Sequence, residues 1–84
     1  MNKKKKTLIF GVTGQDGSFL AKLLCNKNYL VHGLVRKSST GNLDNIKNLL
    51  DKKNFFIHHG DLLDLISIER LIKKIKPDEI YNFA

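Results

Sequence analysis

The sequence predicts an α/β fold in which parallel strands alternate with helices. Apolar runs of strand length alternate with segments whose apolar residues recur at helical spacing, as strand–helix three times and then a strand. Three glycines spaced G-x-x-G-x-x-G join the first run to the first helical segment, and Pro77 ends the last helical segment. This order indicates one parallel sheet with right-handed crossovers, helices on both faces and a ligand site at the carboxyl ends of the strands.

The first strand is expected at residues 7–12, because an almost continuously apolar run is typical of a parallel strand covered on both faces. The first helix should cover about residues 16–26. Its predicted buried face consists of four large apolar residues at helical spacing: Phe19, Leu20, Leu23 and Leu24. The polar residues 26–28 form the turn that follows the helix.

A second strand is predicted at residues 29–35, followed by a polar loop at 36–42. A short amphipathic helix comes next, with its apolar face formed by Leu43, Ile46, Leu49 and Leu50. The third strand is expected at residues 55–58 and is closed by Gly60.

The third helix has the most regular apolar face in the chain, formed by Leu65, Ile68, Leu71, Ile72 and Ile75. The fourth strand is predicted at residues 79–84. A doubly wound dinucleotide domain has about six strands, whereas this chain reaches four. We therefore expect residues 7–84 to be the N-terminal part of a Rossmann-type doubly wound parallel sheet (β-α-β-α-β-α-β), truncated after the fourth strand and preceded by a basic tail at residues 1–6.

Composition restricts the class of protein. The chain has 84 residues, 42% hydrophobic residues, one cysteine and a formal net charge of +7. The lysines lie in the tail and on helix faces without an arginine or aromatic stripe, so we expect no nucleic-acid partner. The apolar runs are too short for an export signal or a membrane span, which predicts a cytoplasmic protein without membrane contact. Cys25 has no partner in the chain, and we expect it to serve packing.

The glycine motif has the chemistry of a phosphate-binding turn. Gly11 permits a sharp turn out of the strand, Gly14 lets a pyrophosphate approach the backbone, and Gly17 lets the helix pack closely on the strand. The helix N-terminus that follows favours a bound phosphate. The alternative is a purely structural glycine turn.

The end of the second strand is where dinucleotide-binding domains select their cofactor. NAD sites usually carry an acidic residue there, whereas this chain has Arg36, followed by Lys37 and Ser38. A guanidinium can hold a 2′-phosphate with two parallel charge-assisted hydrogen bonds. These residues favour NADP over NAD, unless Arg36 and Lys37 are ordinary loop charges.

After the third strand, Asp61 could accept a hydrogen bond from an adenine amino group, and Leu62 could cover the ring. Alternatively, Asp61 or Asp64 caps the third helix. The three histidines match no metal-binding spacing, so no metal site is expected. No pair of residues suggests a nucleophile with its base, so no catalytic residue is assigned.

Four segments together resemble the extended short-chain dehydrogenase/reductases, and most closely the GDP-mannose 4,6-dehydratase family. They are the glycine turn with its helix (residues 11–21), the second strand with its basic-serine loop (31–39), the corner at 59–62, and residues 76–82. The expected cofactor-binding residues are Gly11, Val12, Thr13, Gly14, Gln15, Asp16, Gly17, Arg36, Lys37, Ser38, Asp61 and Leu62.

The resemblance implies a lyase that converts GDP-mannose to GDP-4-keto-6-deoxy-mannose with bound NADP, on the route to GDP-fucose, and that is a homo-oligomer. The family's Thr/Ser–Tyr–Lys group and acid/base glutamate lie beyond the fourth strand, so the 84 residues alone are expected to be inactive. Two alternatives remain open: another NAD(P)-dependent nucleotide-sugar dehydratase or epimerase, and a catalytically inactive truncated remnant.

Overall fold

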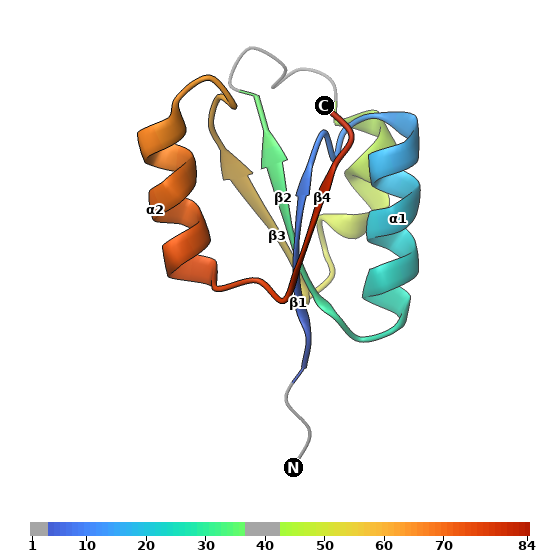
Figure 1. Cartoon of the computed structure of the whole chain (residues 1–84). Coiled ribbons are helices and arrows are strands. Elements are labelled where there is room, and N and C mark those ends of the chain that lie inside the picture. Colours follow the sequence, from blue (N-terminus) through green and yellow to red (C-terminus); the bar gives the residue numbers. More distant parts are fainter. Residues whose placement is uncertain (1–3, 37–42) are drawn as a thin grey trace.

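One parallel sheet forms the centre of the molecule. The computed structural model describes residues 4–36 and 43–84. Its elements are β1 (Lys6–Phe10), α1 (Gln15–Asn26), β2 (Leu30–Val35), the 3-10 helix η2 (Asp44–Leu49), β3 (Phe55–His59), α2 (Leu65–Ile75) and β4 (Glu79–Asn82). The strand order is β3-β2-β1-β4, with α2 on one face of the sheet and α1 and η2 on the other (Figure 1). The predicted parallel α/β architecture is confirmed.

β1 lies inside the sheet, where the strand order changes from one side to the other. It pairs with β2 on one side and with β4 on the other, so that Thr7 lies beside both Val31 and Glu79. β1 ends at Phe10, two residues before the predicted end, because Gly11 has a φ of +79° and turns the chain out of the sheet. The two crossovers that leave opposite sides of β1 open a crevice at the carboxyl ends of the strands.

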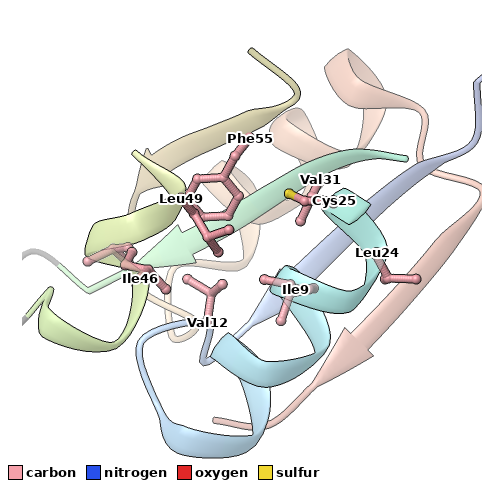
Figure 2. Packing of buried hydrophobic residues seen from close by; sticks show 10 residues of the cluster. Ile9, Val12, Leu24, Cys25, Val31, Ile46, Leu49 and Phe55 are labelled. Atoms are coloured by element: carbon pink, nitrogen blue, oxygen red, sulfur yellow. The ribbon is translucent and has the colours of Figure 1, made fainter. Parts of the chain in front are cut away.

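Two hydrophobic cores cover the two faces of the sheet. The larger core lies between the sheet and α1 with η2, and Figure 2 shows Ile9, Val12, Ile46, Leu49 and Phe55 converging there, with Cys25 at one side of the cluster. The smaller core joins Leu8, Phe10, Leu34 and Ile75 under α2. Burial raises the pKa of the Cys25 thiol, in agreement with a packing role.

The buried face of α1 differs from the prediction. The residues that face the sheet are Gly17, Ser18, Ala21, Leu24 and Cys25. Phe19 is 70% exposed and Leu23 is 43% exposed, so their assignment to the core was wrong. The small side chains of Gly17 and Ala21 allow close approach to the sheet, and this orientation turns Phe19 and Leu23 away from it.

The short element after the polar loop is a 3-10 helix. Ile46 and Leu49 are buried at a spacing of three residues, which matches the three residues per turn of this helix type. Leu50, which was predicted on the same face, is 46% exposed.

α2 has the sequence signals of a helix at both ends. The Asp64 side chain accepts a hydrogen bond from the Ser67 amide at the N-terminus, and Lys76 adopts a left-handed conformation at the C-terminus, directly before Pro77. Ile68, Leu71 and Ile72 pack on the smaller core, but Leu65 is 74% exposed. β4 ends at Asn82 rather than at residue 84. No helix in the described part of the chain is long and apolar enough to cross a membrane.

Candidate functional site

A pocket of about 270 Å³ lies at the carboxyl edge of the sheet. It is lined by residues that follow or end all four strands: Gly11, Thr13, Gly14, Leu34, Arg36, Leu62, Phe83 and Ala84. This is the position at which the crossovers on the two sides of β1 diverge, where open α/β sheets bind ligands.

Two of the glycines are required by close backbone packing. A Cβ at Gly11 would lie 2.7 Å from the backbone of Phe83 and Ala84, and the positive φ of Gly11 adds conformational strain for any other residue. A Cβ at Gly17 would overlap the carbonyl oxygen of Gly11. Gly17 therefore allows α1 to begin directly against the turn that follows β1, one step beyond the close packing on the strand that we predicted.

Gly14, in contrast to Gly11 and Gly17, has room next to its Cα. It lines the pocket, and a Cβ there would meet only the Gly11 carbonyl oxygen, at 3.5 Å. Gly14 also precedes the first residue of α1, and within the described residues no side chain caps this helix. The first-turn amides of a helix have no partner inside the helix. The backbone next to the pocket thus offers both room and hydrogen-bond donors for an anion.

Arg36 and Leu62 reach the same pocket from two other strands. Arg36 directly follows β2, is exposed, and lines the pocket together with the glycine turn. Leu62 follows β3 and adds an apolar wall. Lys37 and Ser38, which we predicted beside Arg36, lie outside the described residues.

The two acidic residues before α2, Asp61 and Asp64, accept hydrogen bonds from different groups. Asp64 caps α2, with its two carboxylate oxygens accepting from the Ser67 amide (3.2 Å) and hydroxyl (2.7 Å). These hydrogen bonds lower the pKa of Asp64. Asp61 is exposed, and one of its carboxylate oxygens accepts from the Leu63 amide at 3.0 Å. The capping alternative thus holds for Asp64.

The structure brings part of the predicted set together. Gly11, Thr13, Gly14, Arg36 and Leu62 surround one pocket. The other described members lie around it but are not part of its lining: Val12 and Gly17 are buried beneath the turn, and Gln15, Asp16 and Asp61 are exposed beside it.

Sequence reasoning missed three residues of the lining, Leu34, Phe83 and Ala84. The backbone of residues 83 and 84 approaches Gly11 because β4 pairs with β1, and the Phe83 amide donates to the Phe10 carbonyl at 2.8 Å. Strand order was the signal that could have identified them, since β4 as the neighbour of β1 must end beside the glycine turn.

The histidines form no metal site in the described part of the chain, where no group of three potential ligands was found. His32 on β2 and His58 on β3 instead contact each other, with 2.9 Å between Nδ1 of His32 and Nε2 of His58. The rings stack, and Phe56 stacks on His32. Burial, with contributions from His58 and Lys6, lowers the pKa of His32 to about 4.

Comparison with known proteins identifies relatives of the whole chain. Residues 8–84 match the family model of GDP-mannose 4,6 dehydratase. The GDP-mannose 4,6-dehydratase of Yersinia enterocolitica is 49% identical over 95% of this chain and 23% of its own length. That of Vibrio cholerae is 45% identical over 96% of this chain and 23% of its own length. The chain therefore spans about a quarter of the length of the curated relatives it matches.

Two solved structures share the fold. The Bordetella bronchiseptica enzyme WbmH in complex with NAD+ has a TM-score of 0.83 and 30% identity, over 98% of this chain and 26% of that one. The dTDP-glucose 4,6-dehydratase of Bacillus anthracis in complex with NAD has a TM-score of 0.83 and 26% identity, over 95% of this chain and 26% of that one. With its strand order, glycine turn and family match taken together, the chain belongs to the GDP-mannose 4,6-dehydratase family.

Proposed function

We propose that this chain is the dinucleotide-binding part of a GDP-mannose 4,6-dehydratase that uses NADP. One observation carries the proposal: a single pocket at the carboxyl edge of the sheet is lined by both the glycine turn and Arg36. The two structural neighbours that were solved with NAD+ or NAD support a nicotinamide dinucleotide as the ligand class.

The residues present fit such a ligand at its pyrophosphate. The missing side chain of Gly14 leaves the backbone open on the pocket side, and the first-turn amides of α1 have no side-chain cap within residues 4–36 and 43–84. Positively polarised amides at a helix N-terminus stabilise a phosphate group.

The preference for NADP rests on Arg36. A guanidinium can donate two parallel hydrogen bonds to a 2′-phosphate, whereas the acidic residue usual in NAD sites would repel that phosphate. Asp61 would accept from the adenine amino group through the carboxylate oxygen that does not bond to Leu63, and Leu62, which lines the pocket, would cover the ring. Lys37 and Ser38 complete the proposed set of phosphate ligands.

In the proposed reaction the dinucleotide supplies hydride uptake from C4 of the sugar of GDP-mannose and hydride return to C6, with loss of water across C5 and C6. The role of this chain is to hold the cofactor. The glycine turn and α1 bind its pyrophosphate, and Arg36 binds its ribose phosphate. The substrate, a place on the route to GDP-fucose, a homo-oligomeric assembly and a cytoplasmic location belong to the same proposal for the whole protein.

A chimera tests the function. Residues 8–84 replace the matched segment of the Yersinia enterocolitica relative, and dissociation constants for NADPH and NADH are measured by fluorescence titration. We expect the chimera to bind NADPH more tightly than NADH. Arg36→Ala should raise the dissociation constant for NADPH by about tenfold and leave that for NADH unchanged. Arg70→Ala is the matched control, because Arg70 is the only other arginine of the sequence and lies exposed on α2. Equal affinity of the unsubstituted chimera for the two cofactors contradicts the NADP assignment, and failure to dehydrate GDP-mannose contradicts the activity.

A further inference from the structure

The glycine turn is held by a side chain from another element. Nδ2 of Asn45, in the first turn of η2, donates to the Thr13 carbonyl oxygen at 2.8 Å, across 32 residues of sequence. In the described part of the chain, no other side chain from outside the turn bonds to residues 11–14. Nothing in the sequence pattern singled out Asn45.

This hydrogen bond fixes one peptide plane. The carbonyl group of Thr13 and the amide of Gly14 belong to the same planar unit and point in opposite directions. Asn45 holds the carbonyl end, and the Gly11 carbonyl oxygen accepts from the Gly14 amide at 3.2 Å. With both ends held, the direction in which the chain enters α1 is fixed, and with it the direction of the first-turn amides beside the pocket.

Asn45 itself is held in place by the core. The next residue, Ile46, is fully buried, and Leu49 is 1% exposed. Both pack in the same cluster as Val12, which directly precedes Thr13 (Figure 2). The short helix is therefore anchored at the base of the turn, so that the Asn45 amide is presented to Thr13 by buried neighbours even though the side chain is exposed.

We propose that Asn45 is a positioning residue for dinucleotide binding, acting through the Thr13–Gly14 peptide. The inference rests on the proposed function, since it assigns the turn to the pyrophosphate. NADP and NAD share the pyrophosphate. Loss of the Asn45 hydrogen bond must therefore weaken the binding of both cofactors by the same factor. Loss of the Arg36 side chain, in contrast, should weaken the binding of NADP alone, because Arg36 contacts the 2′-phosphate.

The test uses the chimera described above, with Asn45→Ala and Asn45→Asp. Aspartate keeps the shape of the side chain but has no N–H to donate to the carbonyl. Asn48→Ala is the matched control, because Asn48 is an exposed asparagine on the same short helix and has no side-chain hydrogen bond within the described residues. Dissociation constants for NADPH and NADH are measured, together with amide hydrogen exchange of residues 11–18 in the ligand-free protein.

We expect both Asn45 variants to raise both dissociation constants by about three- to tenfold, with the NADPH to NADH ratio kept, as loss of one hydrogen bond predicts. Exchange in residues 11–18 should become faster, whereas Asn48→Ala should change neither quantity. Unchanged binding in Asn45→Ala, or a loss confined to NADPH, overturns the positioning role. A chimera that binds neither cofactor before substitution refutes the proposed function itself, and the two failures are therefore distinguishable.

Discussion

His32 and His58 share a hydrogen bond between neighbouring strands, with 2.9 Å between Nδ1 of the first and Nε2 of the second. One of the two nitrogens must carry the proton and the other must lack it. Burial lowers the pKa of both histidines, and the positive charges of Lys6 beside His32 and of Lys74 beside His58 lower it further. The pair therefore joins the edge strand β3 to β2 in its uncharged state.

Acid should weaken the fold through this pair. The pKa of His32 is about 4 in the folded chain and 6.5 in the unfolded chain, so the unfolded state binds more protons between these values. The contribution of His32 to the free energy of unfolding should be constant above pH 6.5. The free energy of unfolding should then fall as the pH drops from 6.5 towards 4. Urea unfolding of the chain at pH 7.5, 6 and 5 measures this. His32→Gln should flatten the dependence, and the exposed His59→Gln should retain it; an unchanged slope in His32→Gln would contradict the assignment.

Substitution by alanine should destabilise the fold strongly at Gly17 but only weakly at Gly14. In Gly17→Ala the new Cβ meets the Gly11 carbonyl, a backbone group that cannot move aside without displacing the turn. We expect a loss of about 2–3 kcal/mol in the free energy of unfolding, which exceeds the gain in helix propensity of about 1 kcal/mol. Gly14→Ala should change stability by less than about 1 kcal/mol, since its Cβ meets a neighbour only at 3.5 Å. It should nevertheless weaken NADPH binding in the chimera. Equal stability losses in the two variants would be inconsistent with this packing.

Lys76 offers a stabilising substitution. It ends α2 with φ 54° and ψ 60°, a left-handed conformation that disfavours side chains with a Cβ. Lys76→Gly should raise the free energy of unfolding by about 0.5–1 kcal/mol, measured by urea denaturation. Lys74→Gly, two residues earlier and inside the helix, should instead lower it by about 1 kcal/mol. The prediction fails if both glycines destabilise the chain.

Substitution of Asp64 should affect the stability of the fold, whereas substitution of Asp61 should affect cofactor binding. Asp64→Ala removes the cap of α2 and should lower the free energy of unfolding, without changing the affinity of the chimera for NADPH. Asp61→Ala removes the proposed acceptor for the adenine amino group, so it should raise the NADPH dissociation constant by about threefold or more. Its effect on stability should be small, because within the described residues its carboxylate makes one hydrogen bond, and that bond is exposed. Reversal of these two patterns would move the adenine contact from Asp61 to Asp64.

The parts of the fold that sequence predicted are those set by local chemistry. The apolar runs, the glycines, Pro77 and the capping alternative for Asp64 each act on neighbouring residues, and the structure agrees with them. The predicted face of α1 was wrong because helical periodicity offered two stripes, and the one with Phe19 and Leu23 is more apolar than the one that packs. Only the close approach at Gly17 decides between them.

Two further features depend on tertiary contacts that no local pattern encodes. Asn45 reaches Thr13 from 32 residues away, and it does so because Ile46 is buried beside Val12. Phe83 and Ala84 line the pocket through the pairing of β4 with β1. A motif search along the chain finds the turn but not the residues that hold it or enclose it.

The contact of Gly11 with the backbone of Phe83 and Ala84 has a consequence for the order of assembly during synthesis. The glycine turn leaves the ribosome early, but the strand that encloses it is made some seventy residues later, as the 72-residue separation of the Lys6–Asp78 hydrogen bond illustrates. Closing so long a loop is slow and costs chain entropy. The glycine turn therefore has no enclosing wall until β4 docks on β1, so under the proposed function the nascent chain should become able to bind a nucleotide in one step, once β4 has been made.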